Sequence, residues 1–567
     1  MNKRLILLVL FFGFHILLSA QEKRKLPFSL HGSIRSEILF SQKDTTIIPP
    51  DLYEKLYDQF ALTNTYLDLN VLSQYVDAGT RFEFLKYPLP GYETDFAGWG
   101  LPYFYVTGKY KKIKLTIGDF YDQFGTGLIF RTYEDRSLGI DNSLRGARLL
   151  VEPYKGVLFK ALGGKQRRYW TYNESFVWGG DLELNLNQWF KSLEEFNTFL
   201  MIGGSFVIKH EKADDIITDP TYQFYLKLPE NVGTYDIRTR LQTGNYTFLV
   251  EYAGKANDPS HDNKYIYKKG SALLLSGSYA KSGLSALFQS KRSDNMSFQS
   301  KRTEDAILPS YINRLPAFTA QQAYILTTLY PYATQPDGEW AFQGSFNYTF
   351  KRNTLLGGKY GALLKLNSSY IRSIDKHYVV DAYDPQNEQT SFLLRGTDGY
   401  TSSFFKLGEK LYYRDFQLSM DKKLSNDFKL NLMYMNQCID WGVVRNEVAT
   451  GVVKTNIFVA ESNYRFNKKM VLRSEIQYLN TKQDEGDWIA GVIEWSVLPY
   501  FMFTVSDMYN AGETGMHYYK ALVSCNYGAH FIQFGYGRTR SGRDCSGGVC
   551  RDVPASRGFT LSYNYNF

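Results

Sequence analysis

The stretch GFTLSYNYNF, residues 558–567, decides the fold of this chain. Apolar and aromatic side chains occupy one parity of it and polar side chains the other: Phe559, Leu561, Tyr563, Tyr565 and Phe567 against Thr560, Ser562, Asn564 and Asn566. A period of two is typical of a β-strand whose two faces meet different surroundings. We expect this strand to close a ring of strands, because closure leaves no sheet edge exposed.

The same alternation recurs along the whole chain, for example in residues 28–40, 243–255, 340–350 and 428–434. The mean hydropathy is only −0.33, yet 16% of the residues are aromatic, with 45 Tyr and 40 Phe. In a transmembrane barrel one face of each strand touches lipid and the other stays polar, and aromatic rings gather at the interfaces. The sequence therefore predicts an all-β protein, a transmembrane antiparallel β-barrel.

The connections between these segments alternate in length. Short links at 72–74, 281–283 and 467–469 alternate with long polar stretches at 41–59, 88–102, 210–234, 256–269, 293–339, 372–410 and 539–556. Outer-membrane barrels have short periplasmic turns and long extracellular loops, and this spacing predicts roughly 20 to 24 strands. Residues 187–196 are the one stretch with a helical period, and that helix would be short.

The first twenty residues have the order of a secretory signal peptide. Lys3 and Arg4 precede an apolar run at 5–18, and Ser19 and Ala20 follow it. The run is short for a membrane anchor, which needs about 20 apolar residues. We therefore expect residues 1–20 to be cleaved after Ala20, and residues 21–567 to form a single barrel domain in a bacterial outer membrane.

Two motifs resemble a known group of proteins. They are GDFYDQFGTGLIFRTYEDRSLGIDNSLRGARLL at residues 118–150 and CSGGVCRDVPASRGFTLSYNYNF at residues 545–567, and they resemble an uncharacterised outer-membrane protein family of Bacteroidota. The final strand also resembles the insertion signal that the barrel assembly machinery reads, which would make that machinery a partner during insertion. The resemblance implies location and architecture, but no activity, because the family has none assigned.

Residues 118–150 break the alternation and are the candidate functional region. They carry charges of both signs among glycines: Asp119, Asp122, Arg131, Glu134, Asp135, Arg136, Asp141, Arg145 and Arg148. Such groups are costly in lipid, so we expect them to face water or one another. One interpretation is a constriction in the lumen whose acids and bases set a field for polar solutes. The other is a structural salt-bridge network that fills the lumen.

Two cysteines close to the end of the chain form a candidate disulfide. Cys545 and Cys550 enclose Ser-Gly-Gly-Val, and an exported protein reaches an oxidising compartment. Zinc is the alternative, but two thiols with no further ligand nearby are too few for it. We therefore favour the disulfide.

No catalytic motif stands out. The seven histidines are scattered, and HExxH and GxSxG are absent from the sequence, so we expect no enzymatic activity and no cofactor or metal. The net charge of +8 is spread out, apart from Lys165-Gln166-Arg167-Arg168. We expect that run on a solvated outer rim, where it can meet anionic lipopolysaccharide. Nucleic acid is not an expected partner, since no basic face is interleaved with aromatic residues.

Two functions of different class remain open. The first is a channel or transporter for polar solutes, gated by residues 118–150 and the long loops. The second is a non-conducting barrel subunit of an outer-membrane assembly or secretion complex, with other envelope proteins as partners. Membrane lipid and lipopolysaccharide surround the barrel in either case.

Overall fold

The computed structural model describes residues 27–48, 59–218, 224–304, 310–385, 387–445, 451–546 and 549–567. The expected signal peptide, residues 1–20, lies outside the described residues. Within these ranges no helix is long and apolar enough to cross a bilayer.

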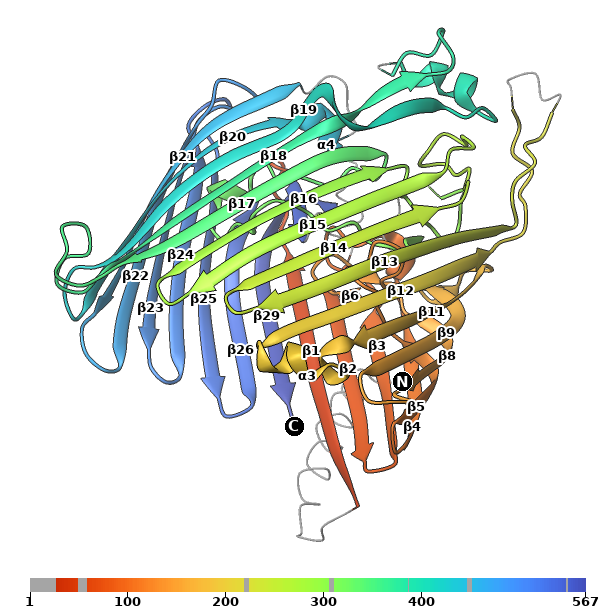
Figure 1. The fold of residues 1–567 in the computed structure, drawn as a ribbon. Helices are drawn as coiled ribbons and strands as arrows, with labels where there is room; N and C mark the ends of the chain where they lie inside the picture. The colour runs from red at the N-terminus through yellow and green to blue at the C-terminus, as the bar shows by residue number, and fades with distance from the viewer. Residues whose placement is uncertain are drawn as a thin grey trace, which may run out of the picture.

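The wall of the molecule is one antiparallel sheet that closes on itself (Figure 1). Twenty-four strands form the ring. They are β1 (Phe28–Ser41), β2 (Leu62–Ser73), β3 (Val76–Leu85), β4 (Gly98–Tyr110), β5 (Ile113–Phe120), β8 (Leu144–Val151), β9 (Val157–Arg168), β11 (Phe176–Asn185), β12 (Thr198–His210), β13 (Asn231–Thr243), β14 (Tyr246–Lys255), β15 (Gly270–Lys281), β16 (Leu284–Asp294), β17 (Gly338–Phe350), β18 (Ala362–Tyr378), β19 (Tyr400–Lys423), β20 (Phe428–Asp440), β21 (Val452–Arg465), β22 (Met470–Asn480), β23 (Trp488–Val497), β24 (Phe501–Asn510), β25 (His517–Tyr527), β26 (His530–Thr539) and β29 (Ser556–Asn566).

Shorter elements lie in the connections. The strands are β6 (Glu134–Asp135), β7 (Ile140–Asp141), β10 (Thr171–Tyr172), β27 (Gly542–Ser546) and β28 (Val549–Val553); the helices are η2 (Thr94–Phe96), η3 (Leu186–Gln188), α3 (Lys191–Glu195), η5 (Leu326–Thr328), η6 (Glu388–Leu394) and α4 (Trp441–Arg445). The single turns η3 and α3 occupy the stretch for which the sequence predicts a short helix.

Strand β29 closes the ring, because it pairs with β26 on one side and with β1 on the other. Its register with β1 runs from Ser41 opposite Gly558 to Ser33 opposite Asn566. The predicted antiparallel barrel of roughly 20 to 24 strands is therefore confirmed, at the upper end of that range.

Side chains alternate between the two faces of the wall as the sequence predicts. On β14, Phe248 and Val250 point outward and are 47% and 41% exposed to the surroundings of the barrel. Glu251, between Val250 and Tyr252, points inward and is fully buried. The outer surface is therefore apolar, and the polar parity faces the lumen, as a transmembrane barrel requires.

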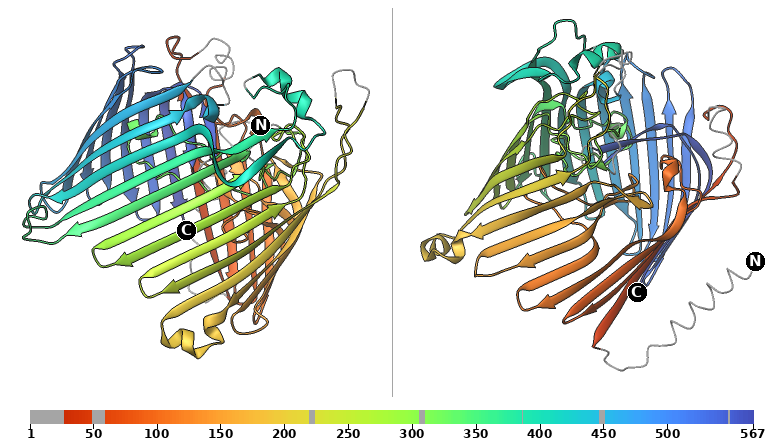
Figure 2. Two further views of the ribbon diagram at one scale, coloured as in Figure 1. Left: turned by 45° about the horizontal axis from the view of Figure 1, so that its top comes forward. Right: turned by 90° about the vertical axis from the view of Figure 1, so that its right-hand side faces the viewer.

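The short and long connections lie on opposite rims (Figures 1 and 2). The C-terminus lies on the rim with the short turns, which is the periplasmic rim in an outer-membrane barrel. One expected loop, residues 372–410, is wrong in extent: β18 and β19 continue as a hairpin far beyond the rim, and only residues 379–399 connect them. Ile374 and Tyr400 of this extension lie in a small buried cluster with Ile266, whereas Phe405 is 84% exposed.

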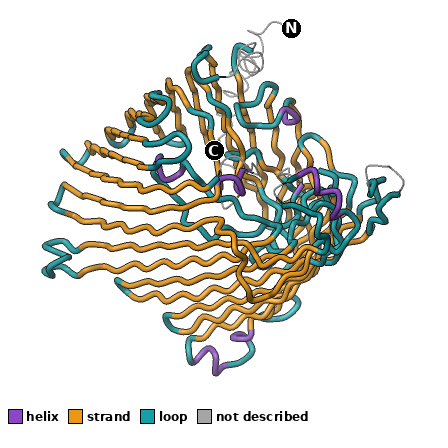
Figure 3. Tube along the Cα trace, turned by 90° about the horizontal axis from the view of Figure 1, so that it is seen from above, coloured by secondary structure: helices purple, strands orange, loops and turns teal. Residues whose placement is uncertain are grey.

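Two segments from the long-loop rim turn into the ring (Figure 3). The first inner segment, residues 121–143, joins β5 to β8. The second inner segment, residues 295–304 and 310–337, lies between β16 and β17. Together they form the plug, and their apolar residues share one buried cluster with inward-facing residues of strands β9 to β24.

Candidate functional site: the plug inside the barrel

The first inner segment is tied to the wall by a buried network of ions. Arg81 on β3 lies 2.9 Å from Glu134, 2.9 Å from Asp141 and 2.8 Å from Asp68. Arg136 pairs with Glu134 at 2.5 Å and with Asp68 on β2 at 2.9 Å. Three of the candidate residues, Glu134, Arg136 and Asp141, therefore meet here.

Arg167 on β9 extends the same network. Its guanidinium lies 2.6 Å from Asp141 and 2.8 Å from Glu83, and its side chain is 1% exposed. The interpretation of residues 165–168 as a solvated rim is wrong for the middle of that run, because Gln166 and Arg167 are buried inside the ring. Alternation alone would put these adjacent side chains on opposite faces. Both are buried because Arg167 pairs with Glu83 and Asp141, while Gln166 donates to the carbonyl of Tyr311 at 2.8 Å.

The remaining acidic and basic candidates sit in separate places. Asp119 and Arg145 are opposite residues of β5 and β8, with N and O atoms 2.7 Å apart. Asp122 accepts from Lys160 at 2.9 Å and from Arg148 at 3.4 Å. Asp135 caps an exposed turn by accepting from the amide and the hydroxyl of Ser137.

Arg131 has a different environment, beside a second cation. Its guanidinium lies 5.0 Å from the ring centre of Tyr133, and that of Arg314 lies 4.7 Å from the same ring. Burial and the nearby positive charge of Arg314 both lower the pKa of Arg131. Burial also raises the pKa of Glu134, against the opposing pull of Arg81 and Arg136.

A carboxylate of the wall holds the tip of the first inner segment. The amide of Thr126 donates to both oxygens of Glu251, at 3.0 and 3.3 Å. Gly125 has a φ of +52°, and a Cβ there would lie 2.6 Å from the carboxylate, so only glycine fits. No ion pair joins Glu251 to a basic residue of the described ranges, which leaves the backbone amide as its main polar partner.

The second inner segment crosses the lumen to the far wall. The phenol of Tyr324 donates to Glu461 on β21 at 3.0 Å. The amide of Leu326 donates to Gln477 on β22 at 2.8 Å, and Gln437 on β20 donates to the carbonyl of Tyr330 at 2.7 Å. The segment begins beside β16, so these contacts can be made only through the interior of the ring.

A fully buried ion pair anchors the same segment at its origin. Lys291 on β16 and Glu339 on β17 lie 2.8 Å apart, and neither side chain is exposed. Lys291 also donates to the carbonyl of Pro316 at 2.5 Å, and Glu339 accepts from the phenol of Tyr332 at 2.6 Å. One ion pair of the wall therefore binds two points of the plug.

The two inner segments are joined directly to one another. The amide of Arg131 donates to Ile312 at 2.8 Å, and that of Arg314 donates to Gly127 at 3.0 Å. The Asn313 side chain donates to the carbonyls of Leu128 and Met296, at 2.9 and 2.8 Å. We call this junction the seam. Its apolar side chains are almost completely buried: Phe124, Leu128, Ile129, Phe130, Met296, Phe298 and Ile312.

The lumen beneath the plug is polar and partly exposed. Arg473 on β22 pairs with Glu461 at 3.4 Å and also with Glu475 and Glu494, and its side chain is 30% exposed. Lys365 and Asp421 form a further pair at 2.6 Å in which both side chains are more than a third exposed. The periplasmic half of the ring thus presents charged groups to water, while the outer half is packed.

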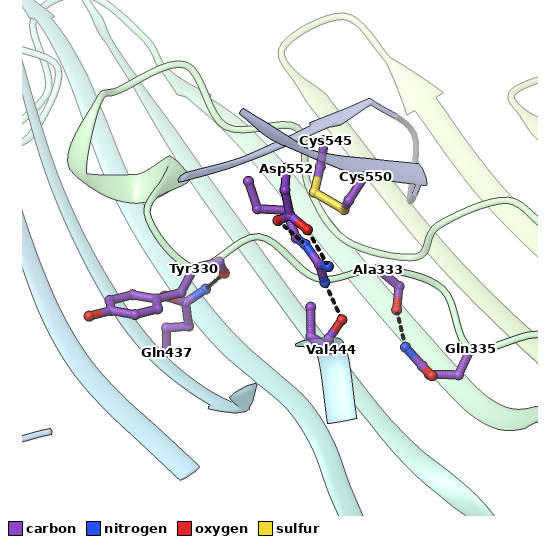
Figure 4. The surroundings of a disulfide bond; sticks show 9 residues. Tyr330, Ala333, Gln335, Gln437, Val444, Cys545, Cys550 and Asp552 are labelled. Atoms are coloured by element: carbon purple, nitrogen blue, oxygen red, sulfur yellow. Dashed lines mark hydrogen bonds and ion pairs between the residues drawn. A yellow bond between two sulfur atoms is a disulfide. The ribbon is translucent and has the colours of Figure 1, made fainter. Parts of the chain in front are cut away.

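Cys545 and Cys550 are joined as a disulfide across the hairpin of β27 and β28. Figure 4 shows this hairpin beside the second inner segment at Ala333 and Gln335, and beside Val444 of α4. Arg543 on β27 donates to the carbonyl of Val444 and pairs with Asp552 at 3.0 Å. The hairpin therefore lies over the outer end of the plug.

The residues missed at the sequence level are those of the wall. Arg81, Asp68 and Glu251 belong to strands with ordinary alternation, and only their inward parity distinguishes them. A charged residue on the lumen parity of a predicted strand is the signal that could have found them. The described residues contain no group of three or more His, Cys, Asp or Glu side chains that could hold a metal ion.

A closed antiparallel ring with an apolar outer face and an internal plug defines this molecule as an outer-membrane type of β-barrel. The chain belongs to a family of unknown function, DUF6029, whose model matches residues 1–567.

Several solved structures match most of this chain at low identity. The P pilus usher PapC translocation pore is 8% identical with a TM-score of 0.42, over 95% of this chain and 99% of that one. The siderophore receptor PirA from Pseudomonas aeruginosa is 8% identical with a TM-score of 0.41, over 96% and 81%. OccAB3 from Acinetobacter baumannii is 10% identical with a TM-score of 0.35, over 95% and 99%. No curated protein matches the chain.

Proposed function

We propose that this protein is an outer-membrane channel for polar solutes that its own plug holds closed at rest. The observation that carries the proposal is the division of the lumen into two halves. The outer half is filled by the two inner segments and their buried seam, whereas the periplasmic half is lined by exposed charged pairs such as Arg473 with Glu494. A ring of 24 strands is wide enough for an aqueous passage unless it is filled.

Opening would require the plug to move, because the described apolar residues of the seam are almost completely buried. The plug is attached to the wall by the shared apolar cluster and by polar contacts, among them Thr126 with Glu251 and Leu326 with Gln477. Such hydrogen bonds contribute about 1 kcal/mol each and can be exchanged for water. The ion networks at Arg81 and Lys291 are stronger attachments, and they lie at the ends of the two segments near the wall. The tips are therefore the parts that can leave first.

Planar-bilayer recording tests this proposal. Wild-type protein should be silent with rare openings, because the plug fills the outer half of the lumen. Replacement of residues 122–141 by a short Gly-Ser linker should give steady conductance, since β5 and β8 remain paired. A second variant, Glu251→Ala, leaves the chain length unchanged and should raise the opening frequency. A wild type and two variants that fold but never conduct would contradict the proposal.

One observation favours the second candidate, a non-conducting subunit of an outer-membrane assembly. The hairpin of β18 and β19 extends beyond the rim and carries Phe405, which is 84% exposed. An aromatic ring so far from lipid suits contact with another envelope protein. Co-purification of a partner at fixed stoichiometry, lost when residues 376–406 are shortened, would support this candidate over the channel.

A further inference from the structure

A cavity of about 500 Å³ lies above the plug, at the mouth of the barrel. Its floor is the seam, represented by Asn313 and Arg314. Its sides come from the 256–269 loop, from η6 and Arg395 in the connection between β18 and β19, from α4, and from the disulfide hairpin at Arg543 and Cys550. The volume falls within the range of roughly 300 to 1,000 Å³ typical of small-molecule sites.

The lining of this cavity is rich in positive charge. Its basic residues are Lys264, Arg314, Arg395, Arg445 and Arg543, and its carboxylates are Asp262 and Asp337. Arg543 is compensated by Asp552, with two guanidinium nitrogens at 3.0 and 3.2 Å from the carboxylate.

Two of these cations hydrogen-bond to neutral groups. Lys264 donates to the phenol of Tyr383 at 2.5 Å. Arg395 donates to the carbonyl of Ile217 at 3.2 Å, and its guanidinium lies 5.5 Å from the ring centre of Tyr265. This differs from the network below, where Arg81 meets three carboxylates within 2.9 Å. Within the described residues, neither Lys264 nor Arg395 has a carboxylate at ion-pair distance, so both can take an anionic ligand as a partner.

The cavity also offers ring faces beside the cations. Tyr133, Tyr265 and Tyr311 line it, and Tyr133 already stacks with Arg314. Guanidinium groups bind carboxylates and phosphates in planar, two-pronged geometry, and an ammonium group binds them as a point charge. The tyrosine rings can cover the carbon skeleton of the same molecule.

We propose that this cavity binds a small organic anion that carries two or more carboxylate or phosphate groups, with Lys264 and Arg395 as its principal contacts. The binding itself does not depend on conductance. The consequence for the channel does rest on the proposed function. The amide of Arg314 donates to Gly127 across the seam, so a ligand held by Arg314 acts directly on that junction. If the ligand binds more tightly when the plug is displaced, its binding free energy favours the displaced plug.

Calorimetric titration of the full chain in detergent tests the proposal. The probes are citrate, fructose 1,6-bisphosphate and, as an uncharged control of similar size, maltose. At least one anion should bind with a Kd below about 1 mM at low ionic strength, and more weakly as salt rises. Maltose should not bind. Citrate alone, the bisphosphate alone, or both would support the site and identify which anionic group it prefers.

Variants locate the binding. Lys264→Gln and Arg395→Gln should each weaken it by about tenfold, the loss expected for one charge-assisted hydrogen bond. Lys269→Gln is the matched control, because Lys269 is an exposed cation of the same loop outside the cavity. Circular dichroism and heat-dependent gel mobility should show that all three variants remain folded barrels.

Three results would overturn the proposal. They are the absence of binding by either anion, equal binding of maltose, and binding that Lys264→Gln and Arg395→Gln leave unchanged. A failure of the channel proposal is separate, because it would appear as silence in bilayers while the titration still shows binding. Conversely, a protein that conducts but binds neither anion would contradict the anion site and leave the channel proposal unaffected.

Discussion

The backbones of Gly32 and Phe567 exchange two hydrogen bonds, and both N···O distances are 2.9 Å. The last residue of the chain thereby continues the pairing of β29 with β1. The ring of Phe567 lies over Gly32 so closely that a Cβ at position 32 would be 2.4 Å from it. The closing contact of the barrel therefore depends on a residue without a side chain.

Gly32→Ala should destabilise the refolded barrel by about 1 to 3 kcal/mol, because the new methyl group overlaps the Phe567 ring. The double variant Gly32→Ala/Phe567→Ala should recover part of this loss, but not all, since the carbonyl oxygen of Asp68 lies 2.9 Å from the same point. Thermal unfolding in detergent measures both. Gly277→Ala is the control, because the nearest atom there is at an ordinary 3.5 Å. An equal effect at Gly277 would contradict the prediction.

Arg81→Gln should lower the free energy of unfolding by about 3 to 5 kcal/mol, the loss typical when one partner of a buried ion network is removed. Glu134, Asp141 and Asp68 would then share fewer positive charges. Denaturant unfolding of the refolded protein measures the change. The matched control is Arg35→Gln, whose partner is Glu37 and whose side chain is 42% exposed, so its loss should stay within about 1 kcal/mol. Similar losses of stability in the two variants would show that the Arg81 network contributes no more to stability than an exposed ion pair.

Arg136→Gln should shift an opened channel toward cation selectivity, because Glu134 and Asp68 lose a compensating charge. The sequence predicts that neutralising both Asp135 and Arg136 alters selectivity. From the structure we expect Arg136 to produce most of the change in selectivity, since Asp135 lies in an exposed turn. Reversal potentials in a salt gradient, measured in the Glu251→Ala background with the plug at full length, should therefore move with Arg136→Gln and barely with Asp135→Asn. The reverse order would show that the exposed turn, and not the network, lines the passage.

Glu251→Ala should speed amide hydrogen exchange in residues 124–130, because Thr126 loses its acceptor. Glu251→Gln keeps one carbonyl oxygen and should give a smaller increase. Mass spectrometry of exchanged peptides measures the exchange rate in both variants. Asp421→Asn serves as the control, since Asp421 pairs with Lys365 and accepts from Asn431, and neither partner belongs to residues 124–130. Unchanged exchange in Glu251→Ala would show that other contacts hold the tip.

Anion binding in the cavity should strengthen as the pH falls. Burial raises the pKa of Asp262, and repulsion by Asp337 acts in the same direction, against hydrogen bonds from Ser297 and Tyr311. A carboxyl whose pKa is raised becomes neutral at a higher pH than usual, so acidification toward that pKa removes a negative charge that opposes the anion. A benzenedisulfonate is a suitable probe, because it stays ionised throughout.

Asp262→Asn should bind the disulfonate more tightly than wild type near neutral pH and should lose most of the pH dependence. His261→Gln separates the contribution of the neighbouring histidine, which also lines the cavity. A pH dependence that survives in Asp262→Asn and vanishes in His261→Gln would assign the effect to the histidine instead.

The sequence left two interpretations of residues 118–150 open, a constriction in the lumen and a structural salt-bridge network. Glu134, Arg136 and Asp141 belong to a buried network of the kind that fills a lumen. The most deeply buried part of the plug is instead the apolar seam, which includes Phe124 and Leu128. The charge pattern indicated where the chain leaves the wall, but not that apolar side chains would close the passage.

The sequence by itself determined the barrel, its strand alternation and its closing strand, because the parity of side chains along a strand is a local property. Only the tertiary structure decided what fills the ring. Thr126 meets Glu251 from 125 residues away, and Asn313 meets Leu128 from 185 residues away. Contacts at such separations depend on the curvature of the closed wall, which brings distant strands to face one another across the lumen, and no local pattern records that distance.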